Sequence, residues 1–327
     1  MIDFRYHLVS IVSIFLALAV GIVLGAGPLQ NEIGATLEDE VAGLRDDKTQ
    51  LNDQLDAARA GTEARDAFTP AANPTVLAER LEGRRVALVV LPDVDSALVE
   101  TTATTLAATG ARVTSTTSVD GGWVTADDSA AAVRETVVTR VAGAVGLDVA
   151  DPGTEVAPRD VLLAALLVTP ADPQAPTVDT AEVERGLGSL ADAGLLSVDT
   201  PDGAFEQAEL VVVLCGTVVA PEGDAEATAA QWVDLTLALD ARGAGSVLAA
   251  QVDPTVEEVQ VMTSLRDDTD AAAEVSGVDD AGEPMGQASV ALALAEQAAG
   301  GVGQYGLAPG AEEPFAPIPA PTPTAVP

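Results

Sequence analysis

Several residue types that carry chemistry in proteins are almost missing from this chain of 327 residues. It has one cysteine, Cys215, one histidine, His7, and one lysine, Lys48. A single cysteine cannot form an intramolecular disulfide. Because His7 lies close to the N-terminus, the rest of the chain has no imidazole for Ser-His or Cys-His catalysis or for a histidine-bound metal. We therefore expect a non-enzymatic protein. The alternative is an enzyme that uses carboxylates alone, as glycoside hydrolases do.

Basic residues are also scarce, with 15 lysines and arginines against 51 acidic residues and a formal net charge of −36. Such a surface repels nucleic-acid phosphates and anionic lipids. The sequence contains neither a Walker A loop nor a GxGxxG motif after a predicted strand. It therefore predicts no nucleic-acid partner and no bound nucleotide or other cofactor, and the acidity is typical of a well-solvated exterior.

The strongest local signal is an uncharged run of 22 residues from Leu8 to Leu29. About 20 apolar residues are enough for a helix to cross the hydrocarbon core of a membrane. Arg5 precedes the run and acidic residues such as Glu32 and Glu38 follow it, so the positive-inside rule places the N-terminus in the cytoplasm. We expect a retained anchor over residues 1–29, with the bulk of the chain outside the cytoplasm. A cleavable signal peptide is the alternative.

A heptad pattern follows the anchor over residues 30–70. Apolar spacings of three and four predict the seam of a coiled-coil stalk, and a polar residue inside such a seam sets register and strand number. The predicted stalk favours a homo-oligomer. The alternative is a single amphipathic helix packed on its own domain. The predicted seam consists of Leu37, Val41, Leu44, Lys48, Leu51 and Leu55.

Residues 74–306 are predicted to form an α/β domain, after a break in the helix at Asn73-Pro74. Buried strands of parallel sheets are continuous β-branched runs, and alternation of strand and helix indicates a mainly parallel sheet. Strands are expected at 84–92, 111–119, 195–198, 210–215, 246–252 and 274–278. Helices are expected at 96–109, 129–144, 158–168, 180–193, 224–241 and 286–299. The fold class is thus α/β with an N-terminal transmembrane helix and a coiled-coil stalk.

The end of the chain, residues 307–327, is rich in proline. Proline has no backbone N–H and favours extended conformations. We expect a disordered tail.

Carboxylates follow two of the predicted strands. Asp93 and Asp95 come after the first strand, and Asp253 comes after a later one. In open α/β sheets ligands bind outside the carboxyl ends of the strands, and carboxylate oxygens suit hard cations. These three residues are therefore the candidates for a metal site. The alternative is that they are turn residues and helix caps.

Two segments carry a resemblance to a known family. The N-terminal block MIDFRYHLVSIVSIFLALAVGIVLGAGPLQ and the late segment SVALALAEQAAGGVGQYG, at 289–306, resemble the copper transport protein B (MctB) family of actinobacterial envelope proteins. The order of anchor, stalk and α/β domain is similar over nearly the whole chain. The resemblance implies a channel or export role in copper homeostasis, with copper as the transported ion, and a location in the outer envelope, including the outer membrane.

The residues themselves indicate neither a copper site nor a pore. Cu(I) prefers thiolate, thioether and imidazole ligands. The cysteine, histidine and methionines of this chain are scattered along the sequence rather than clustered. One predicted spanning helix cannot form a channel, so any channel requires an oligomer. An alternative function fits the same parts, namely an anchored, non-catalytic coiled-coil adaptor that binds an envelope protein partner and regulates cell-wall hydrolysis or cell separation.

Overall fold

The computed structural model describes residues 4–26, 28–149, 156–201, 203–216, 225–252 and 259–318, without the side chains of 26–39. The predicted metal candidate Asp253 lies outside the described residues. The chain divides into two compact units, Met1–Arg65 and Asp66–Pro327.

The chain begins with an apolar helix, α1 (Phe4–Ala26). Among the described residues, one helical segment is long and apolar enough to cross a membrane, namely Phe4–Gly25 of α1. The ends of this helix do not coincide with those of the uncharged run from Leu8 to Leu29. The helix begins four residues earlier, and Pro28 already belongs to the first turn of the next helix. That position suits proline, because the first N–H groups of a helix have no intrahelical partner.

The predicted stalk forms a single long helix, α2 (Pro28–Val76). Four of its predicted seam side chains, Val41, Leu44, Leu51 and Leu55, are between 38% and 64% exposed. The expected break at Asn73-Pro74 is wrong, because the helix continues through both Pro70 and Pro74. An interior proline costs about 3 kcal/mol, and both prolines are exposed, so their own burial does not offset this cost. Leu77 is fully buried directly after the helix, and its N–H donates to the Asn73 carbonyl at 2.8 Å.

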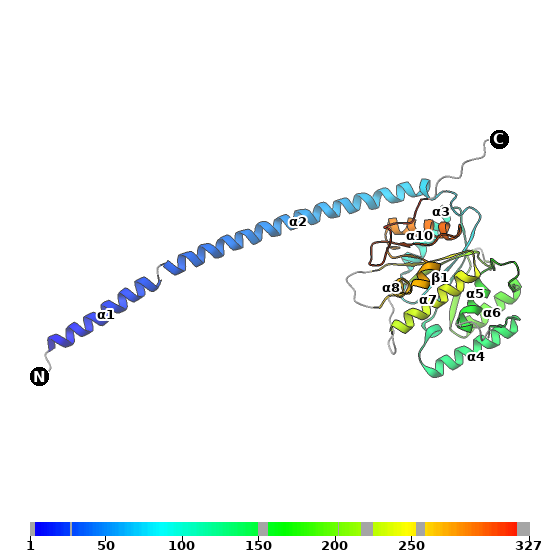
Figure 1. Ribbon diagram of the computed structural model, residues 1–327, viewed down its shortest axis with the longest axis horizontal. Coiled ribbons are helices and arrows are strands. Elements are labelled where there is room, and N and C mark those ends of the chain that lie inside the picture. The colour runs from blue at the N-terminus through cyan, green and yellow to red at the C-terminus, as the bar shows by residue number, and fades with distance from the viewer. Residues whose placement is uncertain are drawn as a thin grey trace. The chain divides into compact units, whose positions relative to one another are not determined.

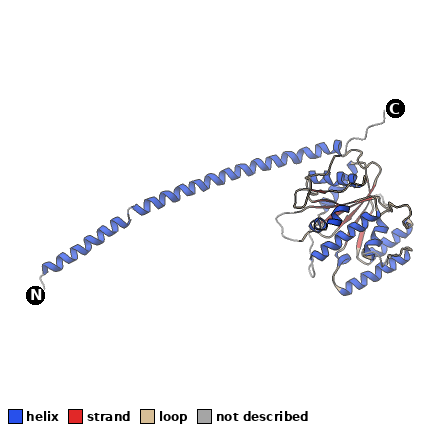
Figure 2. Ribbon diagram, viewed as in Figure 1, coloured by secondary structure: helices blue, strands red, loops and turns tan. Residues whose placement is uncertain are grey.

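The second unit contains a seven-stranded sheet with the order β3-β2-β1-β4-β5-β6-β7 (Figures 1 and 2). Strands pair in parallel throughout, except that β3 runs antiparallel to β2 at one edge. The prediction of a mainly parallel α/β sheet is therefore confirmed. The strands are β1 (Arg85–Val90), β2 (Arg112–Val119), β3 (Leu196–Asp199), β4 (Leu210–Cys215), β5 (Ser246–Ala250), β6 (Ser276–Val278) and β7 (Gln304–Tyr305).

Helices cover both faces of the sheet. On one face, α3 (Ser96–Ala108) and α10 (Pro284–Gln297) pack over alternate strand residues such as Leu88 and Val212. On the other face, the intervening residues of the same strands, such as Val89 and Val213, pack under the remaining helices. These are η1 (Gly121–Val124), α4 (Asp128–Ala144), α5 (Pro158–Leu167), α6 (Thr180–Asp192), α7 (Ala225–Arg242), α8 (Val261–Asp267) and α9 (Thr269–Glu274). The sequence had not predicted η1, α8, α9 or β7.

Aspartates begin many of these helices. The side chains of Asp95, Asp127, Asp179 and Asp268 each accept a hydrogen bond from a backbone N–H in the first turn of α3, α4, α6 and α9. An aspartate cap contributes about 1 kcal/mol relative to alanine. Part of the acidity of the chain thus has a local structural role in addition to solvation.

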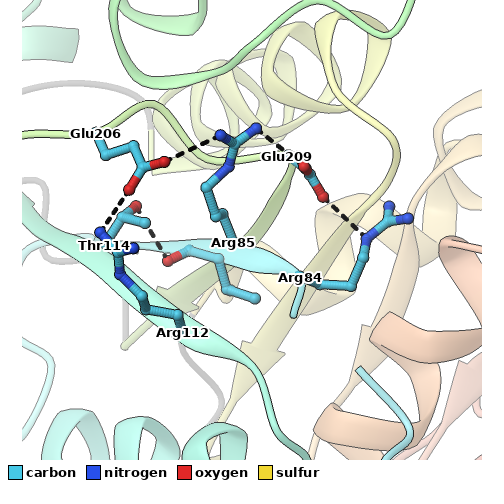
Figure 3. Close-up of polar contacts among 7 residues, drawn as sticks. Arg84, Arg85, Arg112, Thr114, Glu206 and Glu209 are labelled. Carbon is cyan, nitrogen blue, oxygen red and sulfur yellow. Dashed lines mark hydrogen bonds and ion pairs between the residues drawn. The ribbon is translucent and has the colours of Figure 1, made fainter. Parts of the chain in front are cut away.

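An arginine–glutamate cluster joins the amino-terminal ends of the central strands (Figure 3). Arg85 donates to Glu206 at 3.0 Å and to Glu209 at 2.9 Å. Arg84 pairs with Glu209 at 3.0 Å, and Arg112 pairs with Glu206. These bonds hold the pKa of Glu206 below its ordinary value, chiefly through the hydrogen bond from Arg85. The cluster connects β1 and β2 to the segment that enters β4.

The proline-rich end is not disordered where the structure describes it, up to residue 318. The N–H of Gly306 donates to the Glu313 carbonyl at 3.0 Å, and the N–H of Ala316 donates to Ser289 Oγ at 3.1 Å. Ala316 is fully buried within the second unit. Prolines lack a donor, so in this segment the residues between them make the hydrogen bonds. Residues 319–327, the rest of the predicted tail, lie outside the described residues.

Candidate functional site

The candidate site is an open crevice at the carboxyl edge of the sheet. From β1 the chain crosses to β2 on one side, and from β4 it crosses to β5 on the other. The adjacent carboxyl ends of β1 and β4 therefore form a topological switch point, where open α/β sheets bind ligands. A cavity of about 370 Å³ lies there. We call it the switch-point crevice, lined by Asp93, Val94, Asp95, Ala97, Leu98, Thr101, Cys215, Gly216, Gln251, Gly282, Glu283 and Gln287.

Two of the predicted metal candidates line this crevice. Asp93 occupies the turn after β1 with a φ of 64°, a left-handed conformation that aspartate tolerates better than most residues. Asp95 caps α3, and its Oδ1 accepts the N–H of Ala97 at 2.8 Å. A Cβ on Gly216 would lie 2.7 Å from the Asp93 carbonyl oxygen, so only glycine lets β4 end this close to the turn. Asp93 is thus a turn residue and Asp95 a helix cap, the alternative roles that the sequence analysis gave for these carboxylates.

Cys215 contributes to the lining, but its side chain packs in the core on the other face of the sheet, under α4 to α9. The side chain is buried, and burial raises the pKa of its thiol to about 12. A thiol in this environment is a small apolar group rather than a nucleophile or a thiolate ligand.

Gln287 of α10 lies among the lining residues with only 3% of its surface exposed. Its Nε2 donates to Thr102 Oγ1 at 3.2 Å and to the Ala281 carbonyl. Its Oε1 is buried and has no hydrogen-bond partner within the described part of the chain. Gln287 therefore brings to the lining of the crevice an acceptor that has no partner among the described residues.

Two buried aspartates that sequence reasoning missed follow β6. Asp279 is 2% exposed and pairs with Arg266 at 2.7 Å. Its neighbour Asp280 is 6% exposed, and neither carboxylate oxygen has a partner among the described residues. Burial, with a smaller contribution from Asp279, raises the pKa of Asp280 to about 6. Their position directly after a predicted strand was the available signal.

Asp280→Asn is expected to stabilise the protein at pH 7 by about 1 kcal/mol, because it removes a buried, unpaired charge. The ordinary pKa of aspartate is 3.8 and that of folded Asp280 is about 6. Between these values the folded state binds more protons, so stability falls as pH rises from about 4 to about 6. Urea unfolding across this range should show a shallower fall for the variant. Equal slopes for both proteins would contradict the assignment.

A third buried carboxylate, in α5, was also missed. Asp160 is fully buried, accepts from Trp123 Nε1 at 2.8 Å and contacts Arg159 Nε at 3.3 Å. Burial raises its pKa to about 6, although Arg159 and Trp123 act in the opposite direction. Its place in the first turn of α5, after Pro158, resembles an ordinary helix start in the sequence.

The predicted metal site stays untested by the described residues. Asp93 and Asp95 lie on the same turn, but among the described residues no three His, Cys, Asp or Glu side chains could hold a metal ion together. Because Asp253 lies outside those residues, a cation site there stays a prediction. The seam residues of α2 likewise stay a prediction as a coiled coil, and the side chain of Leu37 is not described.

Comparisons with known proteins cover almost the whole chain. A family model described as "Copper transport outer membrane protein, MctB" matches residues 1–316. Proteins named Copper transporter MctB from Mycobacterium tuberculosis and Mycobacterium bovis are 31% identical over 315 residues, which is 95% of this chain and 98% of theirs. The Mycobacterium leprae protein of that name is 29% identical over 320 residues, with the same shares.

The resemblance seen in the N-terminal block and in the segment at 289–306 is thus confirmed over residues 1–316. These relatives are named as transporters rather than as enzymes. One apolar N-terminal helix and this family agree with a membrane or envelope location. The chain belongs to the MctB family of copper transport proteins.

Proposed function

We propose that this chain is a single-pass envelope protein that takes part in copper export and homeostasis. The observation that carries the proposal is the match over 95% of this chain and 98% of relatives named copper transporters. The helix α1 supplies the anchor. Arg5 in its first turn and Glu40 after it favour a cytoplasmic N-terminus and an α/β unit outside.

Copper in this proposal is cargo, and the chain's own side chains support that reading. Cu(I) prefers thiolate, thioether and imidazole ligands. The thiol of Cys215 is buried with a raised pKa, Met262 is 1% exposed in the same core, and His7 is a residue of α1. These groups lie on separate elements, so a tight copper site built from them within one copy is unfavourable.

Transport across a membrane would need several copies, because a single helix encloses no pore. The stalk supplies a means of association. With Val41, Lys48 and Leu55 at position a of the heptad and Leu44 and Leu51 at position d, the exposed apolar residues form one stripe on α2. Two copies anchored in the same membrane would meet in parallel.

The charges beside the stripe suit a parallel pair. A residue at position g faces position e five residues later on the second helix, which places Glu40 opposite Arg45. A Lys48 side chain at position a enters a hole that includes Asp47 of the second helix. Both contacts join opposite charges, so the seam tolerates its polar residue.

The proposed function is tested by the copper content and copper tolerance of a deletion strain. We expect deletion to raise cell copper and lower tolerance, and we expect the intact chain to restore both. A chain without α1 should fail to restore them while being produced at the same level. Unchanged copper would overturn the copper role. If such cells also failed to separate, the adaptor function would replace it.

A further inference from the structure

The switch-point crevice has a charge opposite to that of most doubly wound sites. Phosphates bind at such positions through helix N-termini and basic side chains. Here the lining carries Asp93, Asp95 and Glu283, and none of the described lining residues is a lysine, arginine or histidine. Asp95 already occupies the N-terminus of α3 as its cap. An anionic ligand is therefore disfavoured.

One carboxylate at the crevice is not engaged by its own helix. Glu283 is the N-cap residue of α10, yet its side chain makes no capping hydrogen bond. It is exposed at the rim beside Gly282. Its negative charge is therefore available to a molecule that enters the crevice.

The buried part of the lining independently indicates a hydrogen-bond donor as ligand. Gln287 is 97% buried, since 3% of its surface is exposed, and both donor contacts of its Nε2 are made within the protein. Its Oε1 lacks a donor among the described residues. Burying an acceptor without a partner is unfavourable, so a ligand N–H that reached this oxygen would gain a hydrogen bond.

A further buried charge lies beside the crevice. Asp280 lies two residues before Gly282, and the backbone of Asp280 pairs with that of Gln251. Gly282 and Gln251 both line the crevice. Neither oxygen of its carboxylate has a partner within the described residues. In a poorly hydrated environment its charge adds to the attraction for a cation.

The size and distribution of these groups favour an organic cation over a bare metal ion. A volume of about 370 Å³ falls in the range of small-molecule sites. No three described carboxylate, thiol or imidazole groups converge on one point. Val94, Ala97 and Leu98 add an apolar wall, which would suit a short hydrocarbon chain.

We propose that the switch-point crevice binds a small molecule that carries a primary ammonium group, held by Glu283, Asp93 and the Oε1 of Gln287. An ammonium group has three N–H donors and no acceptor, which matches three acceptors of this kind. This inference is independent of copper transport, so it can fail or hold without changing the proposed function.

Calorimetric titration of the full chain in detergent micelles with cadaverine tests the proposal. The uncharged diol with the same carbon chain and magnesium chloride are the comparison ligands. We expect cadaverine to bind, and the diol to bind at least about tenfold more weakly, because it lacks charge-assisted bonds. Equal binding of the diol would overturn the proposal. The proposal would also be overturned if magnesium competed with cadaverine for the same site and bound there more tightly than cadaverine.

Matched variants distinguish the crevice from the general acidity of a chain with net charge −36. Glu283→Gln and Asp93→Asn should each weaken cadaverine binding about tenfold, and asparagine tolerates the φ of 64° at position 93. Asp128→Asn removes the same charge from exposed α4 and should change nothing. Equal weakening in all three variants would assign the binding to diffuse surface charge and overturn the crevice. Thermal unfolding verifies that each variant is folded.

Discussion

Replacing Asp279 with alanine is expected to lower the free energy of unfolding of the α/β unit by about 3–5 kcal/mol, because it leaves a buried arginine without its counter-charge. The carboxylate accepts from Arg266 Nη1 at 2.7 Å, from the Leu307 N–H at 2.8 Å and from the Ala308 N–H at 3.0 Å. Arg266 Nη2 also donates to the Tyr305 carbonyl at 2.8 Å.

The same carboxylate holds the proline-rich segment on the domain. Without it, the N–H groups of Leu307 and Ala308 lose their acceptor, and the turn that leads to buried Ala316 loses its support. We expect hydrogen exchange over residues 304–316 to rise more than exchange in the central strands. This regional pattern separates the loss of the attachment from general unfolding.

Urea unfolding of the full chain in detergent micelles measures the effect. The control is Asp267→Ala, which removes an exposed acid from the end of neighbouring α8. A double variant, Arg266→Met with Asp279→Leu, should recover part of the loss, because it removes both buried charges. If Asp279→Ala and Asp267→Ala cost the same, the buried pair does not hold this segment.

Replacing Leu44 and Leu51 together with asparagine is expected to weaken self-association of the chain roughly a hundredfold or more. Burying one leucine stabilises by about 1.5–3 kcal/mol, and a dimer would lose four of them. Both side chains are more than 60% exposed in the single chain, so the folded α/β unit should keep its stability. Sedimentation equilibrium in detergent micelles measures the association.

The opposite face of the same helix provides the control. Asp46 and Asp53 occupy the outer position of the proposed heptad, so their replacement with asparagine should leave association unchanged. Lys48→Leu should tighten association, since it replaces the charged residue in the seam by an apolar one. A monomeric wild-type chain, or equal effects from both faces, would show that α2 acts as a single helix.

Much of the second unit could be predicted from local sequence patterns. The run at 84–92 became β1, and the predicted helix at 96–109 became α3. Such elements have strong periodic or β-branched signals and caps that lie within a few residues. Short pieces such as α8 and α9 escaped prediction because seven and six residues give too little periodicity. The order of the strands also had no local signal.

The candidate site was only half visible in the sequence. Asp93 and Asp95 could be placed at the carboxyl end of a strand, and the structure places both at the crevice. Glu283 and Gln287 lie at the start of a helix almost two hundred residues later, and the sequence around them contains no motif that indicates a site. Their contribution depends on α10 packing beside α3.

The sequence by itself determined the apolar helix, the heptad pattern, the acidic surface and the alternation of strands and helices, because each depends on residues near one another in the chain. Tertiary structure alone decided that β1 and β4 are neighbours and that Asp279 holds residues 307 and 308. These outcomes depend on burial and on hydrogen bonds between distant segments, whose energies no local pattern records.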